Sequence, residues 1–111
     1  MTDIYLKEGD LAKAIEFVVE DDTIDFTGAT VAFNMRDEGG TQVVSDAAAT
    51  IETEAYQGGT RSFLRRRPVA PDVVTTGRFD GEFVVTFSDT KTGRFPDRGY
   101  ISILIGAHLD P

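Results

Sequence analysis

The sequence predicts an all-β fold, an antiparallel sandwich of about seven strands that forms one domain over residues 1–111. Turn-forming Gly, Pro and Asp residues recur at short intervals along the chain, from Gly9-Asp10 to Gly99. The runs between these turns are short and rich in Val, Ile, Thr and Phe, residue types that favour strands. Short strands separated by such turns are typical of β-sandwiches, and a chain of this length can form a core without disulfides.

The first strand-forming run covers residues 11–20. Its apolar residues fit the stripe of an amphipathic helix as well as the alternation of a strand. The β-branched pair Val18-Val19 and the β-rich surroundings favour the strand. We therefore expect a strand here, with Ile15, Phe17 and Val19 on one face.

The most informative local pattern is a turn that leads into a strand. Asp25 can accept a hydrogen bond from the backbone two residues further on, as in an Asx turn. Gly28 can adopt a positive φ without steric penalty. In the following residues 31–36 the odd-numbered side chains are all apolar, so we expect these three on one face of a strand.

The middle of the chain predicts further extended segments. Val43-Val44 resumes an extended path after a Gly-Gly turn, and residues 49–55 alternate in a pattern that fits one half-buried strand or two short ones. After a second Gly-Gly turn, a strand is expected over residues 61–67, with Phe63 as its clearest inward side chain. Residues 68–71 should end this strand, because proline cannot donate to a β-ladder.

The last third of the chain carries the strongest alternation. Aromatic and β-branched residues alternate between positions 79 and 87, except at Asp80-Gly81, where we expect a β-bulge. A final strand is expected over residues 101–105. The expected core consists of apolar residues from these strands: Ile15, Phe17, Val31, Phe33, Ile51, Phe83, Val85, Phe87, Ile101, Ile103 and Ile105.

The composition excludes several kinds of function. The chain has 19 Asp and Glu residues against 11 Lys and Arg, a net charge of −8, which argues against general nucleic-acid binding and fits a halophilic source. It has no Cys, so it has no disulfide and no zinc–thiolate site. No apolar run approaches the roughly 18 residues of a membrane-spanning helix, and the acidic N-terminus does not resemble a signal peptide. We expect no nucleic-acid partner and no membrane association.

Four short motifs occur in an order that resembles one protein family. They are Gly9-Asp10, Asp25-Phe26-Thr27-Gly28-Ala29, Gly77-Arg78-Phe79-Asp80-Gly81-Glu82-Phe83 and Pro96-Asp97-Arg98-Gly99-Tyr100-Ile101-Ser102-Ile103-Leu104-Ile105. Together they resemble the immunoglobulin-like N-terminal domain of phage baseplate upper proteins, and they span nearly the whole chain. The sequence departs from the family's pattern at residues 65–68 and at Thr75-Thr76.

The resemblance implies an immunoglobulin-like sandwich that serves as a structural protein of a tailed virus and is not an enzyme. Such a protein would be made in the host cytoplasm and would lie in the virion, at the tail or baseplate. It would contact other virion structural proteins and form a homo-oligomer within a symmetric assembly, without a cofactor. Two other functions fit the sequence, a capsid decoration protein and a carbohydrate- or receptor-binding module. The absence of Trp and the presence of only three Tyr argue against the carbohydrate function.

The candidate partner contacts come from exposed loops. The only basic run, at residues 65–67, suits a neighbouring subunit's carboxylates, a solvated sheet edge that discourages strand pairing, or nucleic acid. In the loop at residues 90–98, Phe95 either anchors a partner or folds back on the core. A third candidate loop lies at residues 21–25. The predicted partner contacts are Arg65, Arg66, Arg67, Phe95 and Arg98.

No residue stands out as catalytic, cofactor-binding or metal-binding. The acidic side chains at residues 20–25 offer the oxygen ligands that calcium prefers, but EF-hand spacing is absent, so a solvated loop is expected. His108 is the only histidine and has no positioned partner in the sequence, which predicts an exposed tail residue.

Overall fold

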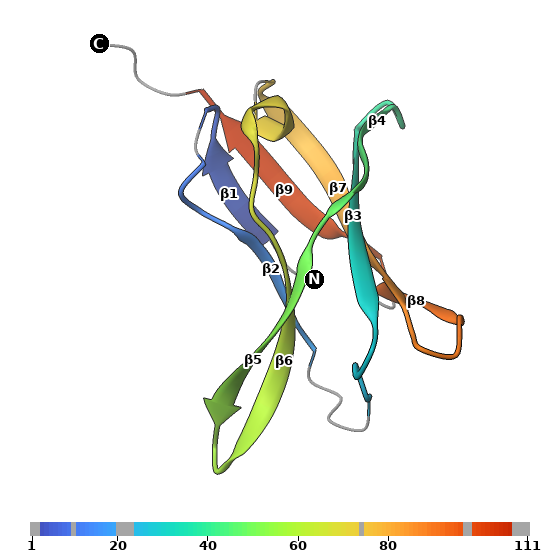
Figure 1. Cartoon of the computed structure of the whole chain (residues 1–111). Coiled ribbons are helices and arrows are strands. Elements are labelled where there is room, and N and C mark those ends of the chain that lie inside the picture. The colour runs from blue at the N-terminus through green and yellow to red at the C-terminus, as the bar shows by residue number, and fades with distance from the viewer. Residues whose placement is uncertain (1–2, 10, 20–23, 74, 97–98, 108–111) are drawn as a thin grey trace.

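The structure, a computed structural model, describes residues 3–9, 11–19, 24–73, 75–96 and 99–107. These residues form two β-sheets that pack face to face as a sandwich (Figure 1). The described elements are β1 (Asp3–Lys7), β2 (Ile15–Val19), β3 (Thr30–Asp37), β4 (Gln42–Ala48), β5 (Thr50–Tyr56), β6 (Gly59–Arg66), the 3-10 helix η1 (Ala70–Val73), β7 (Gly77–Thr86), β8 (Thr92–Phe95) and β9 (Ile101–Gly106). No helix among the described residues is long and apolar enough to cross a membrane.

The larger sheet has the strand order β1-β9-β7-β3-β4, and β8 also pairs with β7. Strand β7 is its centre: one side pairs with β3 along the whole of β3, from Thr30 to Asp37. The other side of β7 pairs with β9 over its first half and with β8 over its second half. The smaller sheet has the order β2-β6-β5 and covers the inner face of the larger one.

The prediction of an all-β, immunoglobulin-like sandwich is confirmed, with nine strands in the described part instead of about seven. The pairing is antiparallel except between β1 and β9, which are parallel. Strand β1 was not predicted, because only two apolar residues alternate there, Ile4 and Leu6. Both are buried once β1 lies beside β9, which comes from the other end of the chain.

The core between the two sheets contains every residue predicted for it, either buried or packed against it. Phe17, Val31, Ile51 and Phe87 are only partly buried, and the other predicted residues are buried. The core also contains buried residues absent from the prediction: Ile4, Leu6, Val19, Met35, Val44, Leu64, Val73 and Phe79. The ambiguous run at residues 11–20 forms a strand over Ile15–Val19, in which Ile15 and Val19 are buried, and residue 20 lies outside the described residues.

Strand β7 has no bulge at Asp80-Gly81, so that prediction is wrong. The pairing of β7 with β3 and β9 continues without a shift through Gly81, which occupies an inward position between Phe79 and Phe83. A Cβ at this position would lie 2.9 Å from Ile103 Cδ1 and 3.1 Å from the Phe33 ring. The glycine is therefore required by close packing of neighbouring side chains, and it does not interrupt the strand.

The predicted turn before β3 is confirmed. The backbone N–H of Thr27 donates to Asp25 Oδ1 at 2.9 Å, which is an Asx turn, and Gly28 has a φ of +75°. The turn brings Phe26 against Phe87, with ring centroids 5.8 Å apart. A local hydrogen bond and an aromatic contact thus fix the point at which the chain enters β3.

Candidate functional site

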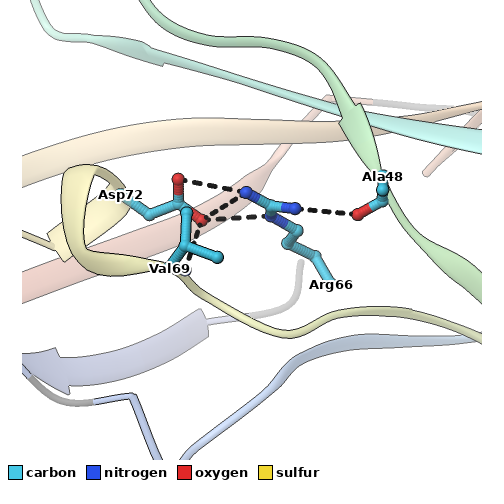
Figure 2. Close-up of polar contacts among 4 residues, drawn as sticks. All are labelled: Ala48, Arg66, Val69 and Asp72. Atoms are coloured by element: carbon cyan, nitrogen blue, oxygen red, sulfur yellow. Dashed lines mark hydrogen bonds and ion pairs between the residues drawn. The ribbon is translucent and has the colours of Figure 1, made fainter.

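Arg66, a predicted partner contact, lies inside the protein (Figure 2). Its Nε donates to Asp72 Oδ2 at 3.0 Å and its Nη2 donates to Asp72 Oδ1 at 3.2 Å. Its Nη1 donates to the carbonyl of Ala48 at 2.9 Å, and the N–H of Val69 donates to Asp72 Oδ2 at 3.2 Å. Arg66 is 8% exposed and Asp72 is 6% exposed, so this is a buried, bidentate ion pair.

The Arg66–Asp72 pair joins three parts of the chain: the end of β6, the helix η1 and the end of β4. Strand alternation explains it, because Leu64 points into the core and Arg66 lies two residues further along the same face. The role of Arg66 is therefore to hold the sandwich together, and its guanidinium is not available to a partner. This corrects the prediction for Arg66.

Arg65 lies on the outer face of the smaller sheet. Its Nε donates to Glu16 Oε2 on β2 at 2.6 Å, and its guanidinium carbon stacks 4.9 Å from the centre of the Phe63 ring. Phe63 is buried beneath it on this outer face, whereas Leu64 is the inward residue of β6, so the prediction that Phe63 points inward is wrong.

The interpretation of the basic run as a sheet edge is also wrong. Strand β6 is the middle strand of the smaller sheet, paired with β2 on one side and with β5 on the other. Arg67 follows the end of β6 and is exposed. Arg98 lies outside the described residues, as do residues 20–23 of the acidic loop and His108.

Phe95 folds back on the core. It belongs to β8, which the sequence reading placed in a loop, and it is partly buried against the core. Its ring lies 6.4 Å from that of Phe17 and 6.2 Å from that of Phe26, measured between centroids. Of the two alternatives for Phe95, the structure shows the inward one.

A hairpin formed by the tips of β5 and β6 extends beyond the rest of the sheet (Figure 1). In the described part of the chain, which for β2 ends at Val19, β2 pairs with β6 as far as Ser62, and β5 and β6 pair with each other out to Tyr56 and Gly59. We call residues 54–61 the hairpin tip.

A groove lies between the base of this hairpin and the turn before β3. It has a volume of about 460 Å³ and is lined by Ile24, Asp25, Phe26, Thr27, Ala29, Ile51, Thr53 and Ser62. Ile24, Phe26, Ala29 and Ile51 are partly buried and pack against the core. The groove is thus an opening between the two sheets with an apolar floor and a polar rim.

Asp25 is the charged side chain at the rim of the groove. Hydrogen bonds from the Thr27 side chain and from the Thr27 backbone lower the pKa of the Asp25 carboxyl. The carboxylate is therefore held in its charged form by the turn it forms. Among the described residues no group of three or more His, Cys, Asp or Glu is arranged to hold a metal ion.

A second polar depression lies on the outer face of the larger sheet. It has a volume of about 130 Å³ and is lined by Asn34, Met35, Arg36, Gln42, Asp80, Glu82 and Tyr100. The guanidinium carbon of Arg36 stacks 4.6 Å from the centre of the Tyr100 ring, and Glu82 pairs with Arg94 at 2.8 Å. No pattern in the sequence indicated this group, because its residues come from four separate segments.

Comparison with known proteins finds a solved structure of similar fold but no match to a protein-family model or to a curated sequence. The crystal structure of CopC from Methylosinus trichosporium OB3b is similar, with a TM-score of 0.51 and 12% identity. The match covers 100% of this chain and 90% of CopC. At this identity the likeness supports the sandwich fold alone.

Proposed function

We propose that this chain is a structural protein of a tailed virus, a tail or baseplate component that works by binding other virion proteins. The proposal follows from the ordered motifs that resemble the baseplate upper protein domain. Two of these motifs have a clear structural purpose in the sandwich. Asp25 and Gly28 form the turn that starts β3, and Gly81 allows close packing of Phe33 against Ile103.

The observation that carries the proposal is the hairpin tip. A hairpin that projects from a sandwich offers contact area to a neighbouring subunit of an assembly. The tip presents mostly exposed side chains, and Arg61 pairs with Glu54 across it. Rigid sandwiches with variable projecting loops suit this task, because the core holds the shape while the projections meet neighbours.

In this proposal the protein acts without catalysis and without a cofactor, and its copies occupy equivalent positions in a symmetric assembly. We do not propose Arg66 or Arg65 as contacts between copies, because Arg66 is buried and Arg65 pairs with Glu16. Arg67 is the residue of the basic run that remains exposed and available for a contact between copies.

The test is to locate the protein on virus particles. We expect antibody labelling at the tail tip of tailed particles from the organism that carries the sequence, and peptides of this chain in their mass spectra. Label on the head would assign the protein to capsid decoration instead. Particles that contain neither label nor peptides would overturn the virion proposal.

A carbohydrate-binding module is the second candidate, and the outer-face depression favours it. Tyr100 supplies an aromatic ring, and Asn34 and Gln42 supply amides beside the Asp80 and Glu82 carboxylates. Aromatic rings with neighbouring amides and carboxylates are the groups that recognise sugars. We expect Tyr100→Ala to abolish any signal on a glycan array; an array without signal for the unchanged protein would exclude this candidate.

A further inference from the structure

The free edge of β5 differs from the edges of the larger sheet in the described part of the chain. Strand β2, the other edge of the smaller sheet, is also regular, but it has five residues against seven in β5. Strand β8 has four residues, and the β3–β4 pairing contains register shifts, with a φ of 50° at Asp46 on β4. Lys13 Nζ donates to the Tyr5 carbonyl of β1 at 2.8 Å. Short strands, irregular pairing and edge lysines are devices that keep other strands from adding to a sheet.

Strand β5 carries none of these devices. It is seven residues long, contains no Pro, Gly or Lys, and pairs with β6 in an unbroken register from Thr50 to Tyr56. It is the last strand of the smaller sheet, so one of its sides has no strand partner in that sheet. A regular strand with an open side is a template for the addition of another strand.

The groove between the sheets lies against the inner face of β5 and β6. Ile51 and Thr53 of β5 line it together with Phe26 and Ala29 from the turn before β3. Alternate side chains of a strand added to β5 would point to the same side as Ile51 and Thr53. They would enter a partly apolar groove of about 460 Å³, which is large enough for aliphatic side chains.

The charges on the outer face of β5 indicate which charge an added strand should carry. Glu52 and Glu54 lie on this face, opposite to that of Ile51 and Thr53, and Glu54 also pairs with Arg61 of β6. If β5 paired with β5 of a second copy, each antiparallel register that keeps the faces and most of the strand would place a glutamate opposite a glutamate. Like charges directly opposite each other destabilise a strand pair, and the net charge of −8 adds repulsion between copies.

We propose that the open edge of β5 is the binding site for an extended strand of a different protein, in which basic residues alternate with apolar ones. The apolar residues enter the groove beside Phe26, and the basic residues lie opposite Glu52 and Glu54. The main-chain hydrogen bonds come from β5 itself. This inference rests on the proposed function, in which the chain binds other virion proteins, and it names the contact and the chemistry of the partner.

The test uses a nine-residue peptide of alternating lysine and valine as the probe. Isotope-labelled protein is titrated with this peptide to millimolar concentration while backbone amide signals are recorded by NMR. We expect shifts and slower amide exchange at Thr50–Tyr56, together with shifts at residues 24–29. A peptide with the same residues in blocks controls for charge alone, and a peptide of alternating glutamate and valine controls for its sign.

A charge reversal sharpens the test. Glu52 makes no ion pair in the described part of the chain, so Glu52→Lys is expected to leave the fold intact. This variant should bind the lysine peptide roughly three- to tenfold more weakly and the glutamate peptide more tightly. The matched control is Thr92→Lys on β8, an exposed position that should change neither affinity.

The proposal is overturned if the peptide shifts amides of another edge, if the two peptide charges bind equally, or if nothing shifts at millimolar peptide. These outcomes leave the virion proposal standing, because particle labelling does not depend on the β5 edge. Conversely, a protein absent from virus particles that still binds the lysine peptide would retain the strand site and lose the virion function.

Discussion

The two ends of strand β6 are held in very different ways. At its C-terminal end, Arg66 is buried and bonded to Asp72 and to the Ala48 carbonyl, so three chain segments are tied together (Figure 2). At its N-terminal end, the pairing of β6 in the described part of the chain is with β5 alone, because the described part of β2 ends at Val19, opposite Ser62. We call these the locked end and the open end.

The comparison separates residues that maintain the fold from residues that remain available for binding. The locked end satisfies its polar groups internally, whereas the open end has exposed side chains, an unpaired strand edge and an adjacent groove. The basic run that looked like a contact surface in the sequence belongs mainly to the locked end. The contact surface that we propose lies instead on the hairpin tip and along the edge of β5.

Removing one partner of the locked end should have the largest effect on stability. Asp72→Ala leaves the Arg66 guanidinium buried without its carboxylate, and we expect a loss of about 3–5 kcal/mol in the free energy of unfolding. Urea denaturation measures it. The double variant Arg66→Met/Asp72→Leu should recover most of the loss, because apolar residues of similar size replace the buried pair. A loss below about 1 kcal/mol for Asp72→Ala would show that the pair is not buried in solution.

An aromatic truncation in the turn that lines the groove should cost less than the loss of the buried ion pair. Phe26 is partly buried and contacts Phe87 and Phe95, so Phe26→Ala should lower the free energy of unfolding by about 2 kcal/mol, less than for a fully buried Phe. Phe26→Leu is the control and should lose about half as much. The same urea series checks both variants. A cost equal to that of Asp72→Ala would contradict the contrast between the two ends.

The turn at the rim of the groove should make stability depend on pH. The folded pKa of Asp25 is lowered, so its contribution is present above the ordinary carboxyl pKa of 3.8 and is lost as the pH falls through the lower folded value. Asp25→Ala should therefore reduce the melting temperature at pH 7, and the difference from the unchanged protein should shrink in acid. Asp25→Asn keeps an Asx-turn acceptor without a charge and should remove only the pH-dependent part.

The hairpin tip should give the smallest change. Glu54 and Arg61 are partly exposed, so Glu54→Gln should change the free energy of unfolding by less than about 0.5 kcal/mol. Hydrogen exchange sharpens this expectation without any substitution: amides at residues 54–61 should exchange faster than those of β6 near Leu64. Equal protection of the amides against exchange along the whole hairpin would mean that the tip is as stable as the rest of β6. This result would contradict the contrast between the two ends.

The predictability of the core followed from local alternation. Phe33, Phe83 and Ile103 lie in strands whose apolar residues recur at every second position, so their faces could be assigned from the sequence. Ile4 and Leu6 form a shorter pattern, and they are buried only because β9 lies beside them. Gly81 looked like an interruption, but its meaning depends on Ile103 and Phe33, which approach it from other strands.

The candidate site was much less predictable. Three consecutive arginines have the same charge in the sequence, but strand alternation and pairing gave each a different environment. Arg65 points outward and pairs with Glu16, whereas Arg66 points inward and pairs with Asp72. Arg67 is exposed beyond the end of the strand. Phe95 likewise had two interpretations, and its contacts with Phe17 and Phe26 decided between them.

The sequence by itself determined the all-β class, the Asx turn at Asp25 and most of the apolar faces, because these depend on residues within a few positions of one another. Only the tertiary structure decided that β6 is a central strand, that β5 has an open edge and that a groove lies beside it. The physical reason is that strand order and edge exposure depend on pairing between distant segments, and the alternation within one strand carries no information about its neighbours.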